Sequence, residues 1–348
     1  PVINTRSFGE DPVKVADKVI AYASGLESGK VLSVCKHFPG HGDTDVDSHK
    51  ALPVLPFTRE RLDSVELYPF KEAIRAGVSG MMVGHLQVPV IEPIGDLPSS
   101  LSRNVVYGLL TEELAFKGLI FTDALAMKGV AGNKSVCLQA LQAGNDMVLA
   151  PRRLKEEMDA VLEAVEKGEL PEEEINAKCR KVLTYKYILG LERKPFVKLS
   201  GLGTRINTPQ TRDLISRLNL AAITVLNNKN DVLPLHPDLK EAAILNVGKP
   251  EEIEPFDRKM KKYTSFARFQ LRKDLPEAEQ QKLRDSLAAY RRVIVTVTEQ
   301  RLAPYQSFFA KFAPESPVIY VFYTPAKSML QIQRAVSAAE AVVLAHAS

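Results

Sequence analysis

Hydrophobic residues in the first 190 or so positions fall into two alternating patterns. Short runs of consecutive apolar residues predict buried strands, and stretches with an apolar residue every third or fourth position predict helices. The predicted strands cover residues 31–36, 80–85, 119–123 and 146–150. The predicted helices cover about 12–27, 59–76, 103–115, 136–143, 154–167 and 171–189. This order, with helices between strands, predicts a parallel sheet covered by helices.

Polar residues that could perform chemistry recur where these strands end, namely Lys36 with His37, His85 and Asp123. A TIM-type (β/α)8 barrel builds its active site in this way, although a doubly wound sheet fits the pattern almost as well. A closed barrel needs eight strands and about 250 residues, whereas this region offers four. Because the chain opens on Pro1 and Val2 without an initiator Met, we expect the C-terminal half of a barrel whose N-terminal half is missing.

A polar connector separates this region from a second α/β pattern. We expect residues 1–195 to form the half-barrel, 196–207 a linker, and 208–348 an α/β sandwich domain that is truncated at its C-terminus. The second domain is predicted to hold strands at 223–226, 242–247, 293–297, 318–322 and 341–344, with helices near 208–222, 276–290 and 326–339.

Composition limits the possible partners. Apolar residues make up 45% and charged residues 25%, and the net charge of +4 is spread along the chain. This pattern predicts no nucleic-acid partner, and no apolar run is long enough for a membrane span. Three Cys residues far apart predict buried free thiols rather than disulfides. No signal peptide is seen, but the chain also opens without an initiator Met. The sequence therefore does not distinguish the bacterial cytoplasm from the periplasm or the exterior.

The segment 36–49, KHFPGHGDTDVDSH, carries the densest chemistry in the chain, with three His and three Asp residues. A metal site would use these atoms, but their spacing matches no familiar zinc pattern. A calcium loop beginning at Asp43 would need Gly where Ser48 stands and Glu where Val54 stands.

Two other interpretations remain for this segment. Its polar groups could satisfy one another in a structural loop. Alternatively, Asp47 could orient His49 and raise its pKa, which suits a group that donates a proton and later removes one. The complement to such an acid would be a carboxylate on another strand end, and Asp123 is the natural candidate.

The same segment resembles the signature of the β-N-acetylglucosaminidase branch of glycoside hydrolase family 3. Further similar segments are RSFGEDP at 6–12, GLIFTDALAM at 118–127, AGNDMVLAP at 143–151 and LNLAAITVLNNKNDVLPL at 218–235. The resemblance implies a TIM-type barrel followed by an α/β sandwich domain. It also implies a retaining exo-hydrolase, without a cofactor, that removes terminal β-linked N-acetylglucosamine from muropeptides or chitin-type oligosaccharides.

The resemblance assigns roles to individual residues. It implies that Asp123 is the nucleophile and His49 the general acid/base, assisted by Asp47. It implies sugar contacts by a further set of side chains: Arg6, Lys36, His37, His85 and Met127. The expected partner is a small carbohydrate with a terminal N-acetylglucosamine, and no obligate protein partner is evident. The alternatives are a β-N-acetylglucosaminide phosphorylase of the same fold and a catalytically silent sugar-binding module.

Overall fold

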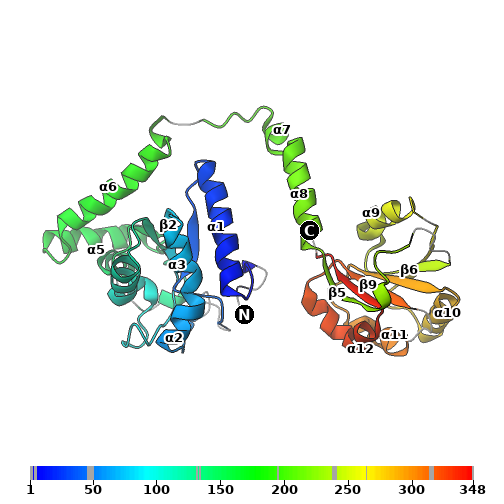
Figure 1. Ribbon diagram of the computed structural model, residues 1–348. Coiled ribbons are helices and arrows are strands. Elements are labelled where there is room, and N and C mark those ends of the chain that lie inside the picture. The colour runs from blue at the N-terminus through cyan, green and yellow to red at the C-terminus, as the bar shows by residue number, and fades with distance from the viewer. Residues whose placement is uncertain are drawn as a thin grey trace. The chain divides into compact units, whose positions relative to one another are not determined.

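The computed structural model describes residues 3, 6–44, 51–130, 132, 135–193, 196–236, 241–263, 265–312 and 317–346. The chain divides into two compact units, Pro1–Val197 and Lys198–Ser348 (Figure 1). Each unit has its own sheet and its own hydrophobic core.

The first unit is built on a four-stranded sheet in the order β1-β2-β3-β4. Its strands are β1 (Val34–Phe38), β2 (Gly80–Val83), β3 (Leu119–Ala124) and β4 (Met147–Leu149). All three pairings are parallel, which confirms the predicted parallel sheet. Eight-stranded closure is not seen among the described residues, so the half-barrel stays a prediction.

Two strand boundaries differ from the sequence prediction in a way that affects the site. Strand β1 runs from Val34 to Phe38 rather than over residues 31–36, and therefore contains His37 as well as Lys36. Strand β2 ends at Val83, so His85 follows the strand instead of belonging to it. Both differences arise because apolar residues alone do not mark where the ladder of backbone hydrogen bonds starts and stops.

Helices accompany the strands of the first unit. They are α1 (Pro12–Ser28), α2 (Arg59–Arg61), α3 (Tyr68–Arg75), α4 (Val136–Ala143), α5 (Leu154–Glu166) and α6 (Glu172–Ile188). Two stretches predicted as ordinary α-helix contain π-helical turns instead, η2 (Leu62–Glu66) and η4 (Asn104–Glu113). Short 3-10 turns complete the unit: η3 (Ser99–Leu101), η5 (Lys128–Val130) and η6 (Leu191–Arg193).

Helix α1 is attached to the sheet through one carboxylate near its end. The Asp11 side chain accepts from the amides of Val13 and Lys14 and so caps the start of the helix. Near the other end, Glu27 Oε1 accepts from the Ser33 hydroxyl and, at 3.0 Å, from the Ser79 amide. Burial alone would raise the pKa of Glu27, but these hydrogen bonds outweigh it and the net pKa is lowered. One ionised side chain thus joins α1 to the entries of β1 and β2.

The second unit is a six-stranded sheet in the order β5-β10-β9-β8-β6-β7. Its strands are β5 (Thr224–Asn228), β6 (Ala242–Val247), β7 (Ala267–Leu271), β8 (Arg292–Val297), β9 (Val318–Phe322) and β10 (Ala341–Leu344). Only the pairing of β5 with β10 is antiparallel. Strand β7 was not predicted, because its sequence ARFQL lacks an apolar run.

The helices of the second unit separate these strands. They are α7 (Leu202–Ile206), α8 (Pro209–Ala222), α9 (Pro250–Met260), α10 (Glu277–Ala288), α11 (Gln306–Lys311) and α12 (Gln333–Ala338), with 3-10 turns η7 (Lys229–Asp231), η8 (Ala303–Tyr305) and η9 (Ala326–Ile332). Helix α9 was also not predicted, since Pro255 lies inside it.

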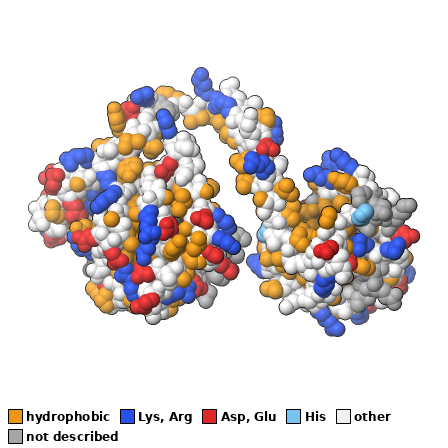
Figure 2. Space-filling view, viewed as in Figure 1, with side chains coloured by type: hydrophobic (Ala, Val, Ile, Leu, Met, Phe, Trp, Pro, Cys, Tyr) orange, Lys and Arg blue, Asp and Glu red, His pale blue; other side chains and the backbone are white. Residues whose placement is uncertain are grey.

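The described surface agrees with the composition. Figure 2 shows Lys and Arg side chains interspersed with Asp and Glu on the face in view, without a continuous basic area. Among the described helices, none combines the length and the apolar character that crossing a membrane requires. Cys35 and Cys137 are buried free thiols as predicted, whereas Cys179 is exposed on α6, so the prediction of burial was wrong for that residue.

The close approach of β3 to the entry of β2 gives a test of the fold. A Cβ at Gly118 would lie 2.3 Å from the Ser79 carbonyl oxygen and 2.5 Å from the tip of the Phe116 ring. We expect Gly118→Ala to lower the free energy of unfolding by about 1–3 kcal/mol, the usual range for overpacking. Urea denaturation measures the change.

Gly108 provides the matched control in the same unit. It lies inside η4, and the nearest atom to its added Cβ is 3.8 Å away. Because Gly weakens a helix interior, Gly108→Ala should be neutral or raise the free energy of unfolding, by up to about 1 kcal/mol. Equal effects of the two substitutions would show that the backbones of Gly118 and Ser79 are not in close contact.

Candidate active site

The candidate site is assembled from strands β1 and β3, which both pair with β2. His37 near the end of β1 and Asp123 near the end of β3 face each other, with 3.6 Å between His37 Nε2 and Asp123 Oδ2. Their side chains are 10% and 17% exposed, so both keep a small contact with solvent. The sequence predicts that Asp123 faces both ends of the segment 36–49 from another strand, and the structure places it opposite the first end, at His37.

A local irregularity in strand pairing places each of these two residues. Lys36 and Phe38 pair with the consecutive residues Met82 and Val83, so His37 is an extra residue in β1. The pairing of β3 with β4 likewise shifts between Phe121 and Ala124. Such bulges re-aim side chains and are common beside active sites.

Asp123 has one carboxylate oxygen fixed and the other directed to the site. Its Oδ1 accepts a 2.8 Å hydrogen bond from the Ala124 amide. Its Oδ2 lies beyond hydrogen-bonding distance of His37 Nε2. The carboxylate is thus oriented through Oδ1, while Oδ2 lies on the side that faces His37.

The His37 imidazole is uncharged at neutral pH. Burial lowers its pKa to about 4, although the carboxylate of Asp123 acts in the opposite direction. The positive charges of Lys36 and Arg6, together with His41, lower the pKa further. A neutral imidazole does not neutralise Asp123 through an ion pair, so it leaves the negative charge that a nucleophile needs.

The remaining predicted sugar contacts occupy different environments. Lys36 and Arg6 are exposed, and both are close enough to influence His37 electrostatically. Met127 follows β3 and is 8% exposed. His85 is fully buried, with Nδ1 2.7 Å from Ser100 Oγ and Nε2 3.1 Å from the Ala124 carbonyl oxygen. Its burial favours support of the end of β3 over direct sugar contact.

The segment after β1 begins with a turn whose described part is well fixed. The carbonyl oxygen of His37 accepts from the amides of Gly40 and His41 at 2.9 and 3.3 Å. The His41 ring is buried, with Nδ1 2.7 Å from Thr44 Oγ1, and it packs edge-on to His37 at 5.8 Å between ring centroids. The predicted acid/base residues Asp47 and His49 lie outside the described residues.

The first unit matches a known family over most of its length. Residues 1–185 match the N-terminal domain of glycosyl hydrolase family 3. The chain belongs to glycosyl hydrolase family 3. The predicted resemblance to that family is therefore confirmed.

Named relatives agree with this family. A β-hexosaminidase A of Pseudoalteromonas piscicida is 34% identical over 257 residues, which are 68% of this chain and 42% of the relative. A β-hexosaminidase of Nitrosospira multiformis is 40% identical over 151 residues, 42% of each chain. The chain thus spans less than half the length of these relatives.

A solved structure is similar along nearly the whole chain. The family 3 β-N-acetylglucosaminidase from Paenibacillus sp. FPU-7 is 29% identical with a TM-score of 0.75, over 99% of this chain and 68% of that one. It supports an α/β fold with parallel sheets.

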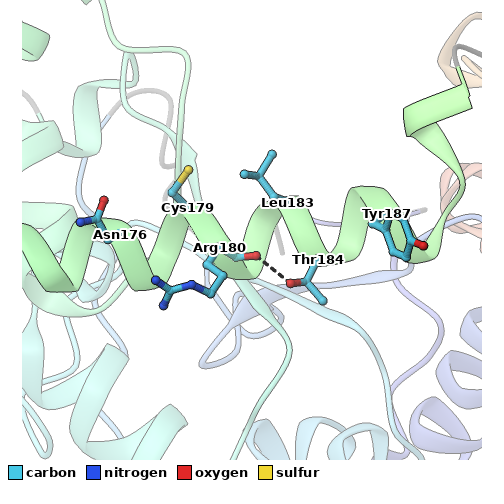
Figure 3. Close-up of a pocket in the computed structure, with 6 residues that line it drawn as sticks. All are labelled: Asn176, Cys179, Arg180, Leu183, Thr184 and Tyr187. Carbon is cyan, nitrogen blue, oxygen red and sulfur yellow. Dashed lines mark hydrogen bonds between the residues drawn. The ribbon is translucent and has the colours of Figure 1, made fainter.

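A hollow of about 440 Å³ lies on helix α6, away from the residues named above. Figure 3 shows six side chains of α6 around it, with the Thr184 hydroxyl donating to the Arg180 carbonyl oxygen at 2.8 Å. The lining residues are Asn176, Cys179, Arg180, Leu183, Thr184 and Tyr187. The residues that line this hollow include no carboxylate that could act as a nucleophile, so the hollow is not a candidate site for glycoside hydrolysis.

The low pKa of His37 predicts a pH dependence of stability. The unfolded chain takes up the proton near pH 6.5, whereas the folded chain does so only near pH 4. The His37 contribution is therefore complete above pH 6.5 and is lost as the pH falls towards 4, at about 1.4 kcal/mol per pKa unit. His37→Gln should make the free energy of unfolding depend less on pH between pH 6.5 and 4. Urea denaturation at several pH values measures this dependence.

The exposed His236 in the second unit, replaced by Gln in the same way, is the matched control. A His37→Gln protein with the same pH dependence as the parent would contradict the assignment, and so would an NMR titration midpoint of His37 at or above 6.5.

Proposed function

We propose that this protein is a retaining β-N-acetylglucosaminidase that removes terminal β-linked N-acetylglucosamine. Asp123 Oδ2 attacks the anomeric carbon and forms a glycosyl-enzyme, while His49 gives its proton to the departing oxygen. Water then attacks the same carbon, His49 takes a proton from it, and Asp123 leaves with the bonding electrons. Asp47 orients the His49 imidazole throughout.

The observation that carries the proposal is the position of Asp123 at the carboxyl end of a parallel strand, opposite His37 at 3.6 Å. Family membership and relatives named β-hexosaminidase support the reaction class and the sugar. The nucleophile role is assigned to Asp123 because its Oδ1 is oriented by the Ala124 amide while its Oδ2 faces His37 at 3.6 Å, beyond hydrogen-bonding distance.

The side chains around Asp123 suit recognition of a sugar. His37, neutral at pH 7, can exchange hydrogen bonds with ring hydroxyls without adding charge, while Lys36 and Arg6 can donate to hydroxyl oxygens from the exposed side. Met127, which follows β3 and is 8% exposed, is proposed as an apolar contact for the sugar. His85 bonds the Ala124 carbonyl oxygen and supports the backbone that follows Asp123.

Loss of the nucleophile gives the direct test. Asp123→Ala should lower kcat on 4-methylumbelliferyl N-acetylglucosaminide by at least about 1,000-fold, because no glycosyl-enzyme forms without its carboxylate. Asp17→Ala, at an exposed position on α1, is the control and should keep the parent rate. Retention of activity by Asp123→Ala would refute the nucleophile assignment.

Product analysis with the parent protein distinguishes the alternatives. In phosphate buffer the expected main product is free N-acetylglucosamine. N-Acetylglucosamine 1-phosphate as the main product would identify a phosphorylase instead. Binding of N-acetylglucosamine without any turnover would indicate a sugar-binding module and end the hydrolase proposal.

The acid role of His49 predicts a dependence on the leaving group. A general acid contributes about 100- to 10,000-fold only where the departing oxygen needs a proton. His49→Ala should therefore lose about this factor in kcat/KM on the phenyl glycoside. It should nearly keep the parent kcat/KM on the 2,4-dinitrophenyl glycoside, whose leaving group departs as a stable anion. Equal losses on both substrates would exclude His49 as the acid.

A further inference from the structure

Arg61 connects the turn after β1 to a buried carboxylate. Its Nη2 donates to Asp43 Oδ2 at 3.1 Å and to Glu66 Oε1 at 2.9 Å. The Arg61 guanidinium also lies over the Phe57 ring, 4.7 Å from its centroid. Arg61 on α2 therefore links Asp43 of the segment 36–49 to Glu66 of η2.

Glu66 is packed directly beneath this turn. Its side chain is 4% exposed, and a Cβ at Gly40 would lie 2.7 Å from Glu66 Cβ. Gly40 has φ +142°, a conformation that a residue with a side chain rarely adopts. The turn therefore rests on the Glu66 side chain, and only glycine fits between them.

The geometry of η2 is what allows this contact. Glu66 closes the π-helical turn Leu62–Glu66, and Arg61 immediately precedes that turn. The extra residue of a π-turn brings together the side chains of Arg61 and Glu66, which are five positions apart. Such turns occur frequently at functional sites. The ion pair raises the pKa of Arg61, chiefly through the Glu66 hydrogen bond.

We propose that Arg61 is a positioning residue for the acid/base pair, acting through Asp43 and Glu66. This inference rests on the proposed function, because Asp43 lies four residues before Asp47 and six before His49. The pairing of β1 with β2 at Lys36 and Phe38 fixes the segment on either side of His37, and Arg61 fixes it a second time at Asp43. The proposed acid/base pair follows this second point in the sequence.

The test separates positioning of the acid from general support of the fold. Arg61→Gln should lower kcat/KM on the phenyl glycoside of N-acetylglucosamine by about 10- to 100-fold, the effect of misplacing a catalytic group by about 1 Å. On the 2,4-dinitrophenyl glycoside, which needs no proton, the loss should stay below about 3-fold. Added azide should increase turnover of the dinitrophenyl glycoside by the variant, since this anion attacks the glycosyl-enzyme without a general base.

Arg59 provides a matched control on the same helix. It also binds two carboxylates, Asp63 and Glu113, and its side chain is 35% exposed against 40% for Arg61. Neither carboxylate belongs to the segment 36–49. Arg59→Gln should therefore change kcat/KM on both glycosides equally, and azide should have no effect on it.

Asp43→Asn covers the case in which Arg61→Gln does not fold. Asp43 is 62% exposed, and Arg61 donates to Glu66 independently of it, so its substitution leaves the Arg61–Glu66 pair intact while it weakens the attachment of the turn. It should produce a smaller leaving-group difference of the same sign. Equal losses on both glycosides by Arg61→Gln and Asp43→Asn, or no loss by either, would overturn the proposal.

Hydrogen exchange gives a readout that does not require activity. In the parent protein the His41 amide is bonded to the His37 carbonyl oxygen. Arg61→Gln should increase exchange in a peptide covering residues 38–44 by at least about 10-fold, and Arg59→Gln should leave it unchanged. If the parent protein shows no turnover, the proposed function fails, but the exchange measurement still decides whether Arg61 holds the turn. Unchanged exchange in Arg61→Gln would refute that role of Arg61.

Discussion

The candidate site depends on how closely β1 and β3 approach β2. Adjacent strands lie about 4.8 Å apart, so the backbones of β1 and β3 are about 10 Å apart across β2. The side chains of His37 and Asp123 extend towards each other across β2, so that 3.6 Å separates His37 Nε2 from Asp123 Oδ2. Glycines at both ends of β2 permit it: a Cβ at Gly80 would lie 2.7 Å from the Ser33 carbonyl oxygen, and one at Gly84 would lie 3.1 Å from His37 Cβ. A larger residue at either position would displace β1 or rotate His37 away from Asp123.

The described carboxylates differ in the hydrogen bonds that they accept. Asp146 Oδ2 accepts from the Ile120 amide at 2.8 Å and from Lys181 Nζ at 2.6 Å, and so joins β3 to α6. Glu92 accepts from the Ser102 hydroxyl, the Asn104 amide group and its neighbour Ile94. Among the described residues, Asp123 accepts from the Ala124 amide through Oδ1, and its Oδ2 faces His37 at 3.6 Å. This difference supports the proposed role of Asp123 as the nucleophile.

Much of this arrangement is predictable from the sequence, because it follows from the alternation of apolar runs and helical periodicity. That pattern gives the four parallel strands of the first unit and the placement of His37 and Asp123 at one edge. It does not give the bulges at those two residues or the π-turn that ends at Glu66, since each depends on one extra residue in a backbone ladder. The Glu27 bridge between Ser33 and Ser79 is equally hidden, because Glu27 and Ser79 lie 52 positions apart in the chain.

The segment after β1 combines two kinds of restraint that respond differently to substitution. His37 lies between Lys36 and Phe38, which both pair with β2, so its position follows that of the sheet. Asp43 is held by one exposed guanidinium, which a single side-chain change removes without disturbing the sheet. In the proposed reaction the sugar is held near His37 and protonated by His49, so a restraint at Asp43 that does not depend on the sheet affects the acid without changing the sugar-binding end. The described part of the turn is attached to Glu66 twice, directly at Gly40 and through Arg61 at Asp43.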